Sequence, residues 1–352
     1  MTEPHPFERC RPGGPHCPWI TAGTPGVGGC LSGDPADFIV DEIPAYPPSG
    51  EGDHFFVRVK KTGLSTGALK AMMARETGVD ERDVGNAGRK DKAAVTTQWL
   101  SFPKPPVAPD DPRIEVLEVH RHPHKLRIGH LRGNHFRIRL YGVDTGALTH
   151  LPALQARIEK GVPNYFGPQR FADGGRGLVG ALAFLANPRR RVRDPKFMAS
   201  VVQAAVFNHW LGARVRRGDF DTALVGDVLK KRDSGGLFDC ESVEVDSGRV
   251  GVGEVDPTGP MLGRKMRAVT GDAETYESTA ATDFGLSERQ LSTLLRWNNG
   301  SRRVARIVPE SLALTVTGDV LEASFFLRKG CFATVILAEL AHPPDGDLRR
   351  RD

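Results

Sequence analysis

The segment Gly161-Val-Pro-Asn-Tyr-Phe-Gly-Pro-Gln-Arg-Phe171 follows the point, near Gly146, where the sequence changes character. Before Gly146, short apolar runs between Pro and Gly clusters predict strands at 38–43, 54–59, 95–102, 114–120, 125–129 and 135–141. After it, helical periodicity dominates until strand-like alternation returns at 304–308, 312–317 and 320–327. Strands at both ends with a helical middle predict an α+β fold, one domain interrupted by an insertion.

Helices are expected at 65–77, 148–160, 199–217, 283–298 and 331–341. Ser65 and Ser287 are suitable N-caps, and Gly78 should end the first helix. Residues 1–29 show little periodicity and are expected to run over the surface. Their glycine-rich stretch 23–29 lacks the Gly-Lys-Ser/Thr ending of a phosphate loop and does not open a helix, so we interpret it as an ordinary loop.

The composition excludes several classes of protein. A length of 352 residues suggests about two domains, and 39% hydrophobic with 26% charged residues excludes a wholly disordered chain. No apolar run approaches the roughly 18 residues of a membrane span, and the polar, Pro-rich start is unlike a secretory signal. Five scattered cysteines do not form a disulfide framework, so a reducing, cytoplasmic setting fits best.

Basic residues point to a possible partner. The 48 basic and 43 acidic residues leave a net charge of +5. Four basic clusters lie at 189–196, 214–217, 230–232 and 302–306. Each alone is either a solvated face or a contact for phosphates, and together they favour a nucleic-acid partner. His120, His122 and His124 alternate without Cys or acidic residues at ligand spacing, so we interpret them as solvated histidines and predict no metal site.

The richest chemistry lies in Gly85-Asn-Ala-Gly-Arg-Lys-Asp-Lys92. Asp91 is flanked by Lys90 and Lys92, and neighbouring cations favour the ionised carboxylate. A carboxylate in a glycine-rich turn before a strand suits a nucleophile or an anion that stabilises a cationic centre. A surface turn with a local ion pair is the alternative, and the residues alone leave both open.

This segment, with Ala94-Val-Thr and Gln98 behind it, resembles the signature of the tRNA pseudouridine synthase D (TruD) family. Further segments are similar to family motifs and occur in the family's order, namely Asp34-Pro-Ala-Asp-Phe-Ile-Val-Asp-Glu42, Leu131-Arg-Gly-Asn-His-Phe136, the segment 161–171 and Gly330-Cys-Phe-Ala-Thr-Val335. The resemblance spans residues 34–340.

The resemblance implies a catalytic domain with a mixed, mainly antiparallel sheet at 30–160 and 307–342. It also implies an inserted α/β TRUD domain at 161–306, with flexible termini at 1–29 and 343–352. The implied activity is isomerisation of a tRNA uridine, typically at position 13, to pseudouridine without a cofactor. The uracil leaves C1′, turns and rejoins through C5; the carboxylate either attacks C1′ or the base, or assists a glycal route.

By the same resemblance, Asp91 matches the catalytic aspartate. Positions around the target uridine match Phe38, Asn134, Phe136 and Phe332. Aromatic faces stack an extruded base, and an amide can bind its edge. Ser32 replaces a lysine common in the family, so the basic partner of Asp91 should be Arg89 or Lys90.

The partner implied is tRNA, with no membrane or metal, and a monomer is favoured. The main alternative is an RNA-binding or RNA-folding module without catalysis, which the intact Asp91, Lys90 and Lys92 disfavour. A nucleoside hydrolase would need an acidic metal cluster that the sequence does not show.

Overall fold

The computed structural model describes residues 5–349, which divide into two compact units. Unit 1 contains the chain up to Gly28, residues 146–308 and residues 334–348. Unit 2 contains residues 29–145 and 309–333, together with Arg349. In the described residues, no helix combines the length and apolar character needed to cross a membrane.

Unit 2 is built on one large sheet. Its strands are β1 (Gly28–Cys30), β2 (Phe38–Pro44), β3 (His54–Thr62), β4 (Gly85–Asn86), β5 (Val95–Phe102), β6 (Ile114–His122), β7 (Leu131–Val143), β14 (Glu310–Thr317) and β15 (Val320–Arg328). The order is β14-β15-β7-β2-β5-β3-β6, with β1 beside β7 and β4 beside β5. Along this order β2 and β5 are parallel and the other pairs are antiparallel, which confirms the mixed, mainly antiparallel sheet.

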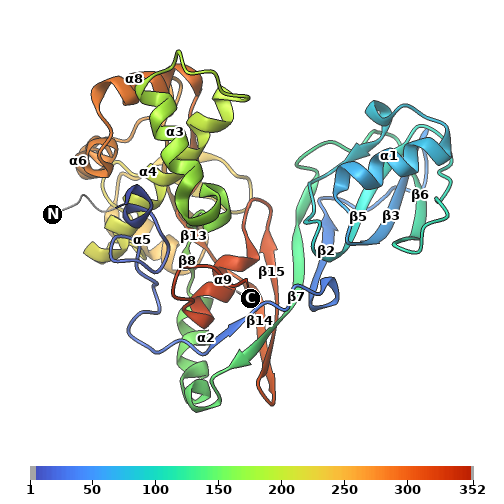
Figure 1. The fold of residues 1–352 in the computed structure, drawn as a ribbon, viewed down its shortest axis with the longest axis horizontal. Coiled ribbons are helices and arrows are strands. Elements are labelled where there is room, and N and C mark those ends of the chain that lie inside the picture. Colours follow the sequence, from blue (N-terminus) through green and yellow to red (C-terminus); the bar gives the residue numbers. More distant parts are fainter. Residues whose placement is uncertain (1–4, 350–352) are drawn as a thin grey trace. The chain divides into compact units, whose positions relative to one another are not determined.

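Helix α1 (Thr66–Thr77) lies across β3 and β5 (Figure 1). Ser65 accepts a hydrogen bond from the N–H of Ala68, and Gly78 ends the helix in a left-handed conformation, both as the sequence predicts. The helix packs its apolar side chains on the sheet, where the buried cluster consists of Val57, Val59, Leu64, Leu69, Met73, Ala74, Val84, Leu100, Phe102 and Ile114. This helix therefore covers one end of one sheet face.

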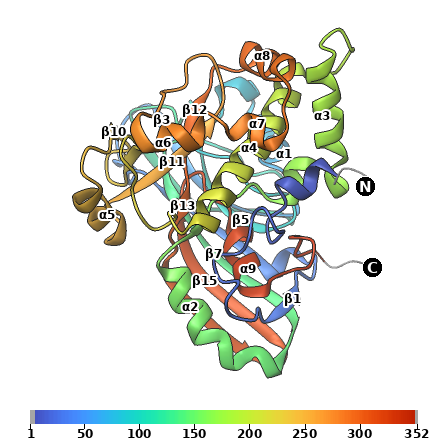
Figure 2. The same cartoon turned by 90° about the vertical axis from the view of Figure 1, so that its left-hand side faces the viewer.

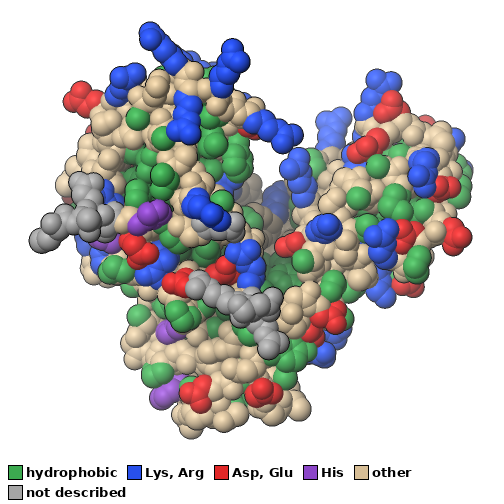
Figure 3. Space-filling view, in the orientation of Figure 1, with side chains coloured by type: hydrophobic (Ala, Val, Ile, Leu, Met, Phe, Trp, Pro, Cys, Tyr) green, Lys and Arg blue, Asp and Glu red, His purple; other side chains and the backbone are tan. Residues whose placement is uncertain are grey.

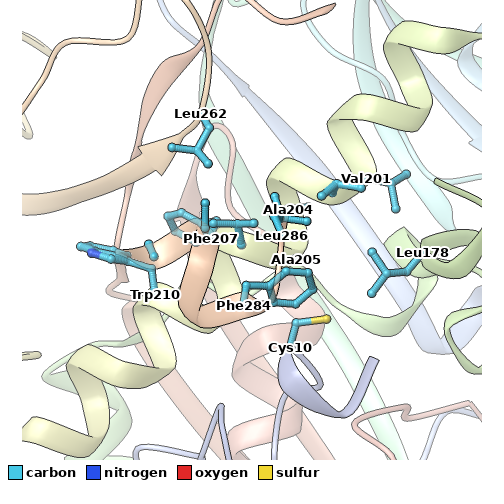
Figure 4. Close-up of a cluster of buried hydrophobic side chains, with 14 of the residues drawn as sticks. Cys10, Leu178, Val201, Ala204, Ala205, Phe207, Trp210, Leu262, Phe284 and Leu286 are labelled. Atoms are coloured by element: carbon cyan, nitrogen blue, oxygen red, sulfur yellow. The ribbon is translucent and has the colours of Figure 1, made fainter. Parts of the chain in front are cut away.

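Unit 1 is centred on the long helix α4 (Pro195–Arg217), which contacts α3 (Arg176–Ala186), α7 (Ala280–Phe284) and α8 (Glu288–Trp297) (Figure 2). Asp194 caps α4, and the capping box of Ser287 and Gln290 begins α8. Apolar side chains of these helices form the core, joined by Cys10 from the N-terminal segment (Figure 4). Because α4 is buried on nearly every side, it is apolar around most of its circumference.

Smaller elements complete unit 1. A four-stranded sheet within the described residues consists of β10 (Leu237–Asp239), β9 (Val228–Lys231), β11 (Val255–Met261) and β12 (Ser301–Val304). The other elements are α2 (Leu151–Glu159), β8 (Val162–Pro163), α5 (Val243–Gly251), α6 (Gly271–Glu277), β13 (Arg306–Ile307) and α9 (Ala333–Ala341). The first residue of α9, Ala333, is assigned to unit 2, and the rest of the helix to unit 1.

The structure corrects three local predictions. Residues 125–129 form turns rather than a strand, because the N–H of Leu126 donates to the Ser101 hydroxyl instead of to a strand backbone. The strand expected at 304–308 is split between β12 and β13. Residues 6–27 do not merely cover the surface, because Phe7, Cys10 and Cys17 are buried in the unit 1 core.

The two compact units do not coincide with the domains expected at 30–160 with 307–342 and at 161–306, since α2 and most of α9 fall in unit 1. That domain division remains a prediction. Of the termini expected to be flexible, residues 1–4 and 350–352 lie outside the described residues, whereas Leu348 is buried.

Candidate active site

Asp91 lies in the loop between β4 and β5, and its side chain is exposed. Its Oδ1 accepts a hydrogen bond from the N–H of Ala93 at 3.1 Å, which forms a tight turn. Its backbone oxygen accepts a hydrogen bond from Nζ of Lys61 at 2.9 Å. The loop is therefore tied to strand β3 at the residue that carries the carboxylate.

The residue before Asp91 fixes the loop to the sheet. The ammonium group of Lys90 forms a buried ion pair with the carboxylate of Glu42 on β2. The backbone N–H of Lys90 donates to Thr66 Oγ1, at the start of α1, at 2.8 Å. Glu42 Oε1 in turn accepts the N–H of Trp99 at 3.0 Å. Lys90 is thus occupied by Glu42, so of the two expected basic partners of Asp91 it is not free for that role. Arg89 is exposed, and its pairing with Asp91 remains a prediction.

Lys61 is the cation that contacts Asp91, through the backbone. Its side chain is fully buried, and this burial lowers the pKa of the ammonium group to about 8. The charge of Asp91 opposes the shift by favouring the protonated form, and the charge of Lys90 adds to it. Ser32, at the position where the family commonly has lysine, instead donates to Asp37 Oδ2 at 2.6 Å.

The sheet register brings together three residues predicted to surround the substrate. Val40 pairs with Phe136, Glu42 with Asn134, and Phe38 with Ile138. Residues directly opposite on neighbouring strands project from the same face, as do residues two apart on one strand. Phe38, Asn134 and Phe136 therefore share a face, and the rings of Phe38 and Phe136 meet edge to face with centroids 6.4 Å apart.

The same face continues onto β5 and β3. Thr96 pairs with Val40 on one side and with Lys61 on the other, and Gln98 follows two residues later. We call this the site face, and it carries Phe38, Val40, Glu42, Lys61, Thr96, Gln98, Asn134 and Phe136. Since Lys61 and Glu42 hold the loop of Asp91, the loop lies at the site face.

Apart from Glu42 Oε2, which is ion-paired with Lys90, three polar atoms on the site face are buried without a hydrogen-bond partner among the described residues: Thr96 Oγ1, Gln98 Nε2 and Asn134 Oδ1. A buried polar group without a partner costs about 1–3 kcal/mol of stability. Gln98 is held in place because its Oε1 accepts the hydroxyl of Thr66 at 3.1 Å. A hydroxyl, an amide N–H and an amide oxygen on this face thus lack hydrogen-bond partners among the described residues.

Phe332 stands apart from this register, in the turn between β15 and α9, and its side chain is 50% exposed. Its role at the target base therefore remains a prediction. No role is predicted from sequence for Glu42, Lys61, Thr96 or Gln98. The available signal was the pair of polar residues Thr96 and Gln98 at alternate positions of β5, a strand that is otherwise buried.

The basic clusters separate into structural and exposed arginines. Arg214 is buried in an ion pair with Asp227 at 2.7 Å, and Arg302 pairs with Glu277 at 2.5 Å. Arg232 and Arg306 both pair with Asp256. Only the cluster at 189–196 is exposed at all of its cations, which are Arg189, Arg190, Arg191, Arg193 and Lys196. The prediction that the other three clusters are available to phosphates is wrong for their buried members, because carboxylates already neutralise them.

The histidines do not form a metal centre in the part of the chain that the structure describes, where no group of three or more His, Cys, Asp or Glu side chains could hold an ion. His122 is buried against Phe56, with ring centroids 4.2 Å apart, and its pKa is lowered by burial. His120 is exposed and lies 3.1 Å from Glu118 Oε2. His122 is therefore a core residue rather than a solvated one.

Fold and site together define an α+β protein in which a cationic loop presents one carboxylate beside a sheet face lined by aromatic rings and amides. Residues 17–185 and 195–340 match the model of the family described as tRNA pseudouridine synthase D (TruD). The chain is 45% identical to the tRNA pseudouridine synthase D of Anaeromyxobacter sp. (strain Fw109-5), over 94% of this chain and 98% of that protein. It is 34% identical to a tRNA pseudouridine synthase D of Thermus thermophilus, over 92% of this chain and 91% of that protein.

A solved structure agrees in fold. The crystal structure named for tRNA pseudouridine synthase D (TruD) from Methanosarcina mazei superposes with a TM-score of 0.74 at 21% identity, covering 97% of this chain and 99% of that one. The chain therefore belongs to the tRNA pseudouridine synthase D (TruD) family, which confirms the membership inferred from its motifs.

Proposed function

We propose that this chain is a tRNA pseudouridine synthase, that Asp91 is its catalytic carboxylate, and that its substrate is a uridine at position 13 of tRNA. The observation that carries the proposal is the junction of the Asp91 loop with the site face, made by the Lys90–Glu42 pair and the Lys61 hydrogen bond. Family membership supplies the reaction class and tRNA as the substrate class.

The site face has the chemistry needed to hold an extruded uracil. The base presents two carbonyl oxygens and an N3–H, which complement the unpartnered Gln98 Nε2, Thr96 hydroxyl and Asn134 Oδ1. Phe38 and Phe136 supply apolar ring surface beside these groups. A base held there would satisfy polar atoms that have no partner among the described residues.

The reaction itself needs no redox partner. The N1–C1′ bond breaks, a C5–C1′ bond forms, C5 loses a proton and N1 gains one, so substrate and product have the same atoms. The exposed carboxylate of Asp91 can act at C1′ or at the base, while Lys61 and Lys90 hold its loop. Lys61 and Lys90 are positioning residues in this scheme. We further propose a cofactor-free monomer that works in the cytoplasm.

The test is pseudouridine formation in an unmodified tRNA transcript, with the modified position mapped by sequencing. We expect product from the native chain and none from Asp91→Asn, with tRNA binding retained because binding rests on distributed cations. Asp41→Asn is the matched control, since Asp41 accepts a hydrogen bond from Thr97 on the opposite sheet face. Turnover by Asp91→Ala would overturn the assignment of Asp91.

A further inference from the structure

We infer that unit 1 carries a second RNA site, a phosphate-binding surface formed by Arg170 and the exposed cations at residues 189–196. This inference rests on the proposed function for its ligand, the phosphate backbone of tRNA. None of its residues belongs to the site face or the Asp91 loop.

Arg170 differs from Arg214, Arg302 and Arg306, the arginines of unit 1 whose side chains are almost fully buried in ion pairs. Arg214, Arg302 and Arg306 are each neutralised by a carboxylate. For Arg170, no ion pair with a carboxylate occurs among the described residues, and burial alone lowers its pKa. Its only hydrogen bond in that part of the chain is from Nη2 to Ser200 Oγ at 2.6 Å. Among the described residues, no carboxylate therefore compensates the charge of this guanidinium.

Aromatic contacts hold this guanidinium in place. Its carbon lies 5.2 Å from the centroid of the Phe197 ring and 5.9 Å from that of Phe166. Ser200 is itself fixed, because its hydroxyl donates to the backbone oxygen of Phe197 at 2.7 Å. The Nε of Arg170 is buried and has no hydrogen-bond partner among the described residues. A preorganised guanidinium with a free donor is suited to phosphate.

Further cations lead directly to Arg170. The loop between α3 and α4 carries Arg189, Arg190, Arg191 and Arg193, and Lys196 follows in the first turn of α4. All five are exposed, and none forms an ion pair with a carboxylate among the described residues. The acid nearest to them in sequence, Asp194, accepts the N–H of Phe197 as the helix cap. Figure 3 shows Lys and Arg side chains gathered over this end of the unit.

The loop and Arg170 are continuous through the start of α4. Arg170 contacts Phe197 and Ser200, which follow Lys196 by one and four residues. Phe197 is 50% exposed, so this cationic surface also presents an aromatic side chain. Uncompensated cations beside an exposed aromatic residue are typical of surfaces that bind the RNA backbone. An acidic protein partner would also match the charge, and the test below makes it a separate outcome.

The experiment measures the affinity of the full-length chain for a tRNA transcript across a salt series. Each phosphate contact contributes roughly 0.7–0.9 to the slope of log affinity against log salt. We expect Arg170→Gln to reduce the slope by about one such contact, and the double variant Arg191→Gln with Arg193→Gln to reduce it by one or two. Arg170→Lys keeps the charge and should retain most of the slope.

Arg217→Gln is the matched control. Arg217 also stacks on an aromatic ring, Tyr276 at 3.7 Å, but it is already paired with Asp219 at 2.7 Å. The slope of log tRNA affinity against log salt should be the same for Arg217→Gln as for the native chain. Because Arg170 is partly buried, the melting temperature of Arg170→Gln is measured first, and the exposed double variant carries the test if Arg170→Gln does not fold.

Pseudouridine formation by the same samples separates the two proposals. If Arg170→Gln and the double variant both keep the salt slope of the native chain and product forms normally, the proposed phosphate-binding surface is rejected. The proposed enzymatic function would then still hold. Reduced slopes with no product from the native chain would support the surface and reject the function. Native slopes combined with capture of an acidic protein would likewise reject the RNA surface.

Discussion

Unit 1 and unit 2 both bury charged and polar side chains, but they differ in how completely the buried donors and acceptors are paired. Arg214 donates two hydrogen bonds to the Asp227 carboxylate and two more to the backbone oxygens of Asp219 and Thr222. Arg306 is similarly shared between Asp256 and the backbone oxygen of Val250. Such complete networks hold a fold together.

The site face of unit 2 has the opposite character. Thr96, Gln98 and Asn134 each leave one polar atom unsatisfied, and the buried ammonium of Lys61 donates only to a backbone oxygen in the described residues. Arg170 is the comparable group in unit 1. The comparison teaches that incomplete pairing, rather than charge itself, distinguishes groups available to a ligand from groups that stabilise the fold.

The largest expected effect breaks a complete network. Asp227→Asn should lower the free energy of unfolding by about 3–5 kcal/mol, because it leaves Arg214 buried without its counter-charge. Denaturant unfolding, followed by a signal from unit 1, measures this loss of unfolding free energy. Asp219→Asn, which removes a more exposed partner of Arg217, should cost less than about 1 kcal/mol. If both variants lost the same small amount of unfolding free energy, the buried Arg214–Asp227 pair would contribute no more to stability than the more exposed Arg217–Asp219 pair.

Lys61 supplies a pH test of incomplete pairing. Its pKa is about 8 in the folded protein against an ordinary value of 10.5, so the folded chain holds this proton more weakly than the unfolded chain. The free energy of unfolding of the native chain should therefore rise as the pH increases from about 8 to 10.5. Measured against Lys61→Met, which lacks this titrating group, the rise should be up to about 3 kcal/mol. Lys60→Met, an exposed change on the opposite face, should reproduce the native pH dependence. If the free energy of unfolding depended on pH in the same way for the native chain and Lys61→Met, the lowered pKa of Lys61 would be refuted.

Thr96→Val should separate stability from function. The substitution is nearly isosteric and removes a buried hydroxyl without a partner among the described residues, so we expect a gain of about 1–2 kcal/mol in stability. If Thr96 binds the target base as proposed, turnover should fall, because the base loses a hydrogen-bonding group. Thr97→Val is the matched control on the opposite face, where the hydroxyl donates to Asp41 and its loss should destabilise. A Thr96→Val protein with native turnover would exclude Thr96 from the site.

Much of the fold could be predicted because its signals are local. Val95–Phe102 is a strand over the predicted residues, and the caps at Ser65 and Ser287 begin helices where expected. A cap or an apolar run acts over a few residues, so the sequence shows it directly. The strand predicted at residues 125–129 is absent from the structure, because a tertiary hydrogen bond, from the N–H of Leu126 to the Ser101 hydroxyl, decides the conformation there.

The contacts of the site could not be predicted in this way. Lys90 pairs with Glu42 and Lys61 reaches Asp91 only because the sheet places β2, β3 and the loop together. The basic clusters posed the same difficulty, since Arg214 and Arg306 look in sequence like the exposed arginines of 189–193. Their neutralising acids, Asp227 and Asp256, become visible only in the fold.

The smallest expected change in stability concerns Phe332. Half of its side chain is exposed, so Phe332→Leu should leave the melting temperature nearly unchanged. If Phe332 stacks on the target base, where stacking is worth roughly 1–3 kcal/mol, turnover should nevertheless fall strongly. Phe325→Leu is the contrast, because Phe325 is fully buried on β15 against Phe136 and its replacement should lower the melting temperature. A Phe332→Leu protein with depressed melting and normal turnover would make Phe332 a packing residue and remove it from the site.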